Sequence, residues 1–101
     1  MSKKEQEYEV CFVVYGHILS KDANIGNLEC NGTIFNSEEN EWTIKDGRAY
    51  YTVTAKSPND AYQKGYDMFK TDNFQDLIID NWTLEHVSKN DEYWYSEDIT
   101  Q

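Results

Sequence analysis

The fold is decided by the stretch EWTIKDGRAYYTVTAKSPNDAYQKGY, residues 41–66, in which two alternating segments lead into the start of a helix. Asp46-Gly47 is the dipeptide typical of a two-residue type I′ hairpin turn. A turn there would bring most of the larger apolar side chains to one face of the hairpin: Trp42, Ile44, Ala49, Tyr51 and Val53. We therefore predict a hairpin that turns at Asp46-Gly47, with Tyr50 among threonines on its polar face.

The second half of this stretch predicts a helix over residues 58–70. Ser57 is a good N-cap residue, Pro58 suits the first helical position, and Asp60 adds a negative charge to the first turn. Lys70 provides the positive charge that the last turn favours. One apolar stripe along the helix is predicted to face the sheet: Ala61, Gly65, Met68 and Phe69, with Tyr62 and Tyr66 beside it.

The flanking segments add strands on either side of this unit. Residues 8–16 begin by alternating and become continuously apolar, as in a strand buried on both faces. Asn31-Gly32 favours a further hairpin, residues 36–40 form a charged turn, and residues 82–88 read as a final strand that returns to the sheet. We predict a single α+β domain over residues 1–101, an antiparallel sheet of about four to six strands with one helix on one face. Residues 1–7 are a flexible lead-in and residues 90–101 an acidic aromatic tail.

Composition limits the classes of function. The 101 residues include 19 acids and 9 bases, for a formal charge of -10, which argues against a basic surface for binding nucleic acid. The longest apolar run, residues 10–15, is too short to span a membrane, and no signal peptide is visible. Cys11 and Cys30 are expected as small buried hydrophobes. The expected compartment is the cytoplasm, or the host bacterial cytoplasm if the protein is encoded by a phage.

No residue pattern points to catalysis. His17 and His86 have no Cys or carboxylate at the spacing of a zinc site, and no nucleophile, phosphate-loop or metalloprotease motif occurs. We therefore expect no enzymatic activity, no metal and no cofactor.

The acids are concentrated near the end of the chain. Residues 1–70 hold eleven acids and eight bases, whereas residues 71–101 hold eight acids and one base. Asp72, Asp76 and Asp80 are spaced by four, so a helix there would align the three carboxylates at a cost of a few tenths of a kcal/mol per pair. A strand over the same residues would break this ladder.

The tail interleaves its acids with Tyr93, Trp94 and Tyr95. Aromatic rings surrounded by carboxylates suit an interface with a basic, arginine-rich groove, since the rings supply contact area and cation–π partners while the acids steer association. Alternatively, the rings fold back as a lid over the sheet and the acids serve only solubility. Both interpretations remain open from the sequence.

The strand-to-helix junction TVTAKSPNDAYQKGY, within residues 49–88, resembles that of small β-hairpin–helix–strand proteins of phages and conjugative elements. In size, acidity and lack of catalytic motifs the chain also resembles anti-CRISPR and anti-restriction proteins, some of which mimic nucleic acid. The resemblance implies an inhibitor that occupies the nucleic-acid-binding groove of a nuclease or effector complex, with no direct binding of nucleic acid or membrane. The sequence indicates no oligomeric state.

Carboxylates would then stand in for phosphates, and aromatic rings would anchor the partner. The candidate partner-binding residues are Asp72, Asp76, Asp80, Asp91, Glu92, Tyr93, Trp94, Tyr95, Glu97 and Asp98. Two alternatives are an immunity protein that neutralises a nuclease toxin, and a non-enzymatic regulatory or assembly module that binds through the open face of the sheet.

Overall fold

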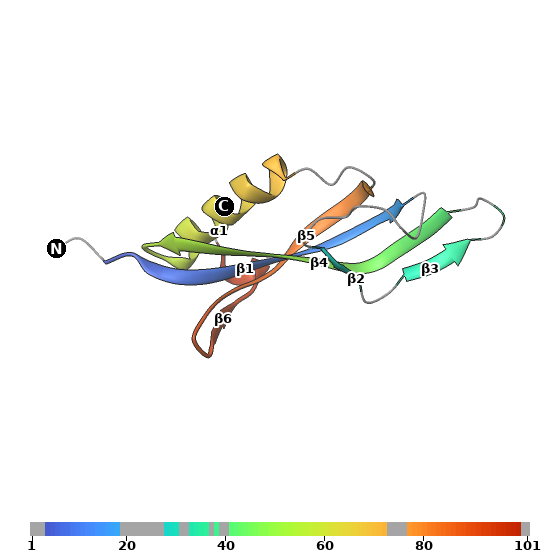
Figure 1. Cartoon of the computed structure of the whole chain (residues 1–101). Helices are drawn as coiled ribbons and strands as arrows, with labels where there is room; N and C mark the ends of the chain where they lie inside the picture. Colours follow the sequence, from blue (N-terminus) through green and yellow to red (C-terminus); the bar gives the residue numbers. More distant parts are fainter. Residues whose placement is uncertain are drawn as a thin grey trace. The chain divides into compact units, whose positions relative to one another are not determined.

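The computed structural model describes residues 4–18, 28–30, 33–36, 38, 41–72 and 77–99. In chain order the described elements are β1 (Gln6–Ile18), β2 (Glu29–Cys30), β3 (Thr33–Asn36), β4 (Glu41–Ala55), α1 (Pro58–Thr71), β5 (Leu77–Lys89), β6 (Glu92–Trp94) and a 3-10 turn, η1 (Ser96–Asp98). The strands form one sheet in the order β2-β4-β1-β5-β6, and β3 also pairs with β4 (Figure 1). The prediction of an α+β fold, an antiparallel sheet with one helix packed on it, is confirmed.

Internal contacts divide the chain into two compact units, which are described separately. Unit 1 comprises Met1–Cys11, Tyr50–Asp72 and Leu84–Gln101, and unit 2 comprises Phe12–Ala49 and Asn73–Thr83. The strands β1, β4 and β5 therefore each contribute residues to both units. The single domain that the sequence suggests stays a prediction. β1 begins at Gln6, so the last two residues of the predicted lead-in belong to a strand.

In unit 1, α1 begins where the sequence predicts and ends one residue later. The Ser57 side chain accepts a hydrogen bond from the Asp60 backbone N–H (3.1 Å), and Pro58 opens the helix. The buried residues of α1 are Ala61, Tyr62, Gly65 and Phe69. Met68 is 44% exposed, so its predicted place in the buried stripe is wrong. Tyr62, one turn from Gly65 and two turns from Phe69, is buried in its place.

The closest approach of α1 to the sheet of unit 1 lies at Gly65. An added Cβ at this position would stand 2.8 Å from Val10 Cβ and Cγ1, and Val10 is fully buried in β1. Real Cβ atoms do not approach other heavy atoms this closely, so only glycine lets α1 rest on β1 here. Further along the same helix, the Phe69 ring packs edge-on against Tyr51 of β4, with ring centroids 6.3 Å apart.

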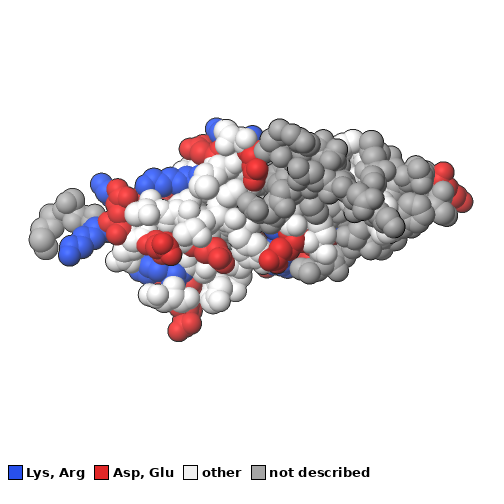
Figure 2. All heavy atoms as spheres, in the orientation of Figure 1, with Lys and Arg blue, Asp and Glu red and all other residues white. Residues whose placement is uncertain are grey.

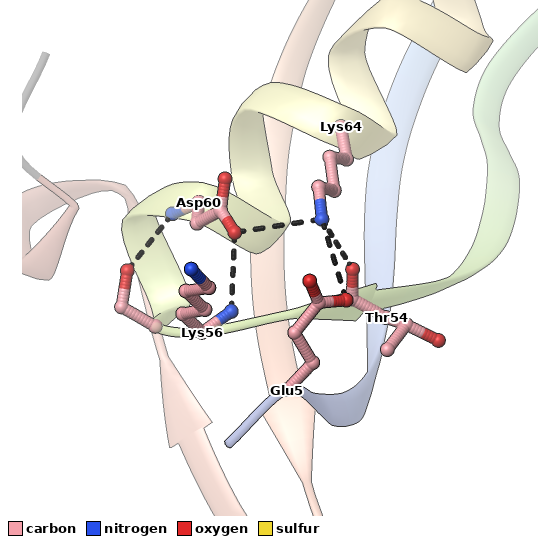
Figure 3. Close-up of polar contacts among 6 residues, drawn as sticks. Glu5, Thr54, Lys56, Asp60 and Lys64 are labelled. Carbon is pink, nitrogen blue, oxygen red and sulfur yellow. Dashed lines mark hydrogen bonds and ion pairs between the residues drawn. The ribbon is translucent and has the colours of Figure 1, made fainter. Parts of the chain in front are cut away.

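A polar cluster ties the first turns of α1 to the neighbouring strands (Figure 3). Lys64 Nζ donates to the backbone carbonyl of Thr54 (2.6 Å) and lies 3.6 Å from Asp60 Oδ2 and 4.0 Å from Glu5 Oε2. The Lys56 backbone N–H donates to the same oxygen of Asp60 (3.1 Å). One lysine thus links the helix, the end of β4 and the residue preceding β1.

Unit 2 is built on the second half of β1. Phe12, Val13 and Val14 are buried in succession, as predicted for a strand covered on both faces. Phe12 contacts the Trp82 ring edge-on, with centroids 5.7 Å apart. Ile44 of β4 is 1% exposed and completes this core together with other buried residues of the unit: Ile18, Leu28, Ala49 and Leu77.

The predicted hairpin at Asp46-Gly47 is wrong, because β4 runs unbroken from Glu41 to Ala55. β4 lies between β1 on one side and β2 and β3 on the other, and Gly47 pairs with Cys30 of β2. An added Cβ at Gly47 would lie 3.0 Å from Ile44 Cγ2, so these two positions face the same side of β4. Residues three apart in a regular strand face opposite sides, so the alternation of side chains shifts by one residue between Ile44 and Gly47. Glycine serves close packing here, and pairing on both sides outweighs a local turn preference.

The hairpin predicted at Asn31-Gly32 is also wrong. β2 and β3 both pair antiparallel with β4, so they run in the same direction along it and do not pair with each other. The dipeptide itself lies outside the described residues. The chain reverses instead between β3 and β4, where Asn36 is paired with Glu41 across the predicted charged turn.

The carboxylate ladder at Asp72, Asp76 and Asp80 does not form as a helix. Asp72 is the C-cap of α1, where its N–H donates to the Phe69 carbonyl (3.2 Å), and Asp80 lies within β5. Asp76 lies outside the described residues. For Asp80 the strand interpretation is confirmed, and β5 contains the predicted residues 82–88 and starts at Leu77. In the described part of the chain, no helix has the length and apolar character needed to cross a membrane.

The contact between α1 and β1 predicts the effect of Gly65→Ala. Alanine raises helix propensity by about 1 kcal/mol, but its methyl group would overlap buried Val10. We expect a net loss of about 1–3 kcal/mol in the free energy of unfolding, measured by urea denaturation. Gln63→Ala, at an exposed position of the same helix, is the control and is expected to change stability by less than about 0.5 kcal/mol. A Gly65→Ala protein more stable than the parent would contradict the close approach.

The cluster in Figure 3 predicts a pH dependence. The hydrogen bond from the Lys56 backbone N–H lowers the pKa of Asp60 from its ordinary 3.8; burial opposes this shift, and the charge of Lys64 adds a smaller lowering. A carboxyl with a lowered pKa stabilises the fold above its unfolded-state value, and this stabilisation is lost as pH falls through the folded-state value.

Asp60→Asn should therefore be less stable than the parent at neutral pH, with the difference closing as pH falls below about 4. Thermal unfolding across this range measures it. Asp67→Asn removes the same charge from the same helix outside the cluster and corrects for net charge. A difference that persists unchanged at low pH would argue against the assignment.

Candidate functional site

Strand alternation in unit 1 separates a covered face of the sheet from an open one. Val10 and Tyr51 contact α1, so they lie on the covered face. Neighbouring residues of a strand point to opposite faces. Glu9 and Thr52 therefore lie on the open face, and Glu7, two residues before Glu9, lies there too. Both glutamates and Thr52 are exposed.

The hairpin of β5 and β6 extends this open face. Ser88 is paired with Tyr93, which places the two side chains on the same side of the sheet. Lys89 is paired with Glu92 across a two-residue turn, Asn90-Asp91, and Asn90 has a left-handed φ of 56°. Asparagine tolerates this conformation better than most residues, so the tight two-residue turn that the sequence suggested at Asp46-Gly47 forms here instead.

An open cavity of about 390 Å³ lies in this part of unit 1. It is bounded by residues from four strands and by the β5–β6 turn: Glu7, Tyr8, Glu9, Thr52, Ser88, Lys89, Asn90 and Tyr93. Most of these side chains are polar, in contrast to the mainly apolar pockets that bind drug-like ligands. The cavity therefore suits a charged or strongly polar group.

The two glutamates that line the cavity, Glu7 and Glu9, contribute no polar contact that would stabilise the described part of the fold. No hydrogen bond or ion pair joins the Glu7 or Glu9 carboxylate to another described residue. Glutamate is depleted in strands, and two carboxylates at alternate positions on one face repel each other. Folding alone gives no reason to place both on β1, which is the middle strand of the sheet.

The tail residues divide into two groups by exposure. Tyr93 is 53% exposed and Tyr95 48% exposed, whereas Trp94 is half-buried and packs edge-on against Tyr8, with ring centroids 6.0 Å apart. Ile99, at the end of the described tail, is buried. The lid and anchor interpretations therefore apply to different residues: Trp94 and Ile99 hold the tail down, and the two tyrosines face outward.

The outward tyrosines are held in place by neighbouring groups. The His86 ring lies edge-on to Tyr93 and Tyr95, at centroid distances of 5.3 Å and 6.4 Å. The Tyr95 backbone N–H donates to Asp98 Oδ2 (3.1 Å), and the Asp98 N–H donates back to the Tyr95 carbonyl (2.8 Å). This reciprocal pair fixes the turn that carries Glu97, so the segment presents its side chains from a defined backbone.

The remaining acids of the tail are exposed. They are Asp91, Glu92, Glu97 and Asp98, and no basic residue lies between Asn90 and Ile99. On the face of the molecule seen in Figure 2, acids around α1 and the start of β1 are interleaved with lysines and do not merge into one patch. Within the tail itself, by contrast, residues 90–99 contain acids and no bases.

Two other predicted site residues are engaged elsewhere. Asp72 Oδ2 accepts a hydrogen bond from the Tyr51 hydroxyl (2.7 Å). Burial and, after it, the Asp72 carboxylate raise the pKa of Tyr51 well above its ordinary range, so the phenol stays a donor. Asp80 belongs to unit 2, where its Oδ2 lies 3.0 Å from His17 Nδ1. The seventh acid of the set, Asp76, lies outside the described residues.

The cavity residues of β1, β4 and β5 were not among the sequence candidates. Glu7 and Glu9 carried a usable signal, because E-Y-E-V alternates charged and apolar residues at the start of a strand. Thr52 and Ser88 carried none that distinguishes them from other polar strand residues. Asn90-Asp91, between two alternating segments, was the signal for the β5–β6 hairpin.

In the part of the chain that the structure describes, no group of three or more His, Cys, Asp or Glu residues is arranged to hold a metal ion. The chain matches no protein-family model, and comparisons with curated proteins and with solved structures return no match. Function is therefore inferred from the chemistry of the open face and the tail.

The two groups of tail aromatics predict losses of stability of different size. Trp94→Ala removes a half-buried ring from its contact with Tyr8 and should lower the free energy of unfolding by about 1–3 kcal/mol. Tyr95→Ala removes an outward ring and should cost less than about 0.5 kcal/mol. Urea denaturation of both variants measures this. Equal losses would mean that the tyrosine also serves as part of the lid.

Proposed function

We propose that this protein is a non-enzymatic inhibitor that binds a basic surface of a nucleic-acid-handling enzyme, of the anti-CRISPR or anti-restriction type, partly in place of nucleic acid. Such an enzyme would be a nuclease or an effector complex in the bacterial cytoplasm. The observation that carries the proposal is the pair of exposed tyrosines, Tyr93 and Tyr95, in a segment whose charged residues are all acids.

Each component of this surface matches a need of such an interface. Exposed tyrosines supply contact area at low cost in side-chain entropy, and they pair with arginine through cation–π contacts. The exposed carboxylates of Asp91, Glu92 and Glu97 belong to the same short segment and would stand in for phosphates. A groove that binds nucleic acid is rich in Arg and Lys, so electrostatic complementarity would speed association and set orientation.

The open face supports a charged partner over a packing module. A module that docks by hydrophobic contact needs an apolar patch at its centre. The centre of the open face carries Glu7, Glu9 and Thr52 instead. An immunity protein for a nuclease toxin would use the same surface chemistry with one cognate partner, and a toxin gene beside the coding sequence would favour that alternative.

The proposal predicts capture that depends on salt and on the tail acids. The immobilised protein is incubated with bacterial lysate at low and high salt, and retained proteins are identified by mass spectrometry. Retention of a nucleic-acid-handling enzyme should weaken by at least about tenfold as the screening length falls from about 10 Å towards 3 Å. The enzyme is then purified, and duplex DNA and RNA should compete with its binding to the immobilised protein.

The variant Glu92→Lys/Glu97→Lys should lose this binding. It avoids Asp98, whose carboxylate supports the backbone at Tyr95. The matched control is Glu29→Lys/Asp67→Lys, which reverses two exposed acids outside the tail and changes net charge equally. Binding that is flat across salt, or lost equally in both variants, would overturn the proposed function.

A further inference from the structure

The cavity on the open face of unit 1 has the features of a receptor for a single cationic side chain. Glu7 and Glu9 lie on its β1 side, at alternate strand positions whose Cα atoms are about 7 Å apart. Oxygen acceptors of Thr52 and Ser88 come from the strands on either side. Tyr93 of β6 closes the far side and is held by its contact with His86.

The one basic residue that lines the cavity forms no ion pair with these carboxylates. Lys89 contributes to the cavity lining, but its Nζ donates to Gln6 Oε1 (2.6 Å) and lies 5.6 Å from the centroid of the Tyr8 ring. Alternation places Tyr8, two residues from Val10, on the covered face of the sheet. The lysine is therefore held towards the other face, and both carboxylates remain available to a ligand.

We propose that this cavity receives an arginine side chain from the basic partner, which makes it a defined anchor point within the acidic and aromatic surface. The inference rests on the proposed function, since a basic partner supplies the arginine. It goes beyond that function by assigning a specific subsite and ligand group, built mainly by residues outside the tail.

The geometry favours arginine over a compact cation. Guanidinium is planar and has five donors in a fixed fork, so it can bridge separated acceptors and lie against an aromatic ring. Acceptors from Glu7, Glu9, Thr52 and Ser88 are spread over three adjacent strands, and Tyr93 supplies a ring at one side. An ammonium is a point charge with three donors and would satisfy fewer of these groups at once.

The concave shape adds to the attraction. A cation inside a cavity is partly shielded from water, so its interaction with a carboxylate is stronger than that of the same pair on a convex surface. The ring of Tyr93 can add a cation–π contribution. On the flat part of the tail surface, by contrast, ion pairs stay exposed and contribute little individually.

The test uses the full chain labelled with ¹⁵N and three small probes: N-acetyl-arginine amide, N-acetyl-lysine amide and the neutral isostere N-acetyl-citrulline amide. We expect the arginine probe to shift the backbone amide signals of Glu7, Glu9, Ser88 and Tyr93 in a saturable manner, with weak affinity on the order of millimolar. The citrulline probe should produce no saturable shift, and the lysine probe should bind more weakly.

Two pairs of variants define the subsite. Glu7→Gln/Glu9→Gln should weaken the arginine probe by roughly five- to tenfold, while Glu92→Gln/Glu97→Gln, with the same change in charge, should leave it within about twofold. Tyr93→Leu should weaken it by roughly two- to fivefold, whereas Tyr93→Phe, which keeps the ring, should not. A dispersed amide spectrum establishes that each variant is folded.

The outcomes separate this inference from the proposed function. Absent shifts in the cavity, equal binding of citrulline, or equal loss in both glutamine variants would overturn the arginine subsite, and equal binding of lysine would overturn its selectivity. If the subsite fails while partner capture still depends on salt and on Glu92 and Glu97, the proposed function stands. If the arginine probe binds as expected but capture does not depend on them, the proposed function is wrong.

Discussion

The contact between Gly65 and Val10 is the constraint on which the rest of unit 1 depends. Because no Cβ fits between α1 and β1 at this point, the helix approaches the sheet closely enough to bury Val10 completely. Once Val10 faces the helix, strand alternation assigns Glu7 and Glu9 to the other side. The absence of a side chain at Gly65 therefore helps to determine that Glu7 and Glu9 of the central strand are exposed to solvent.

Pairing between distant strands outweighs local turn preference in this chain. Asp46-Gly47 has the turn chemistry of a hairpin, yet it lies inside β4, which is paired on both sides. Asn90-Asp91 has a weaker turn signal and does form a two-residue turn. β6 is the edge strand of the sheet, so β5 has no other strand to pair with on that side. A turn dipeptide indicates that the backbone can adopt a tight turn. Whether the turn forms depends on how the residues on either side pair with other strands.

Charge concentrated in the sequence is not charge concentrated on a surface. Of the acids after residue 70, Asp72 accepts the hydroxyl of Tyr51 and Asp80 pairs with His17, so both have local partners. The exposed acids that follow Asp80 all belong to the tail. Glu7 and Glu9, from a part of the chain with nearly balanced charge, join the same unit and lie on its open face. The candidate surface thus draws its acids from both ends of the sequence.

The sequence by itself determined the elements whose signals are local. The helix start at Ser57-Pro58 follows from capping chemistry, the apolar run of β1 from burial on both faces, and the α+β class from their order. The exposure of Tyr93 and Tyr95, the burial behind Trp94 and the cavity above Glu7 and Glu9 were decided only by tertiary structure. They depend on which strands lie side by side and which face the helix covers, and these are properties of contacts between residues far apart in the chain.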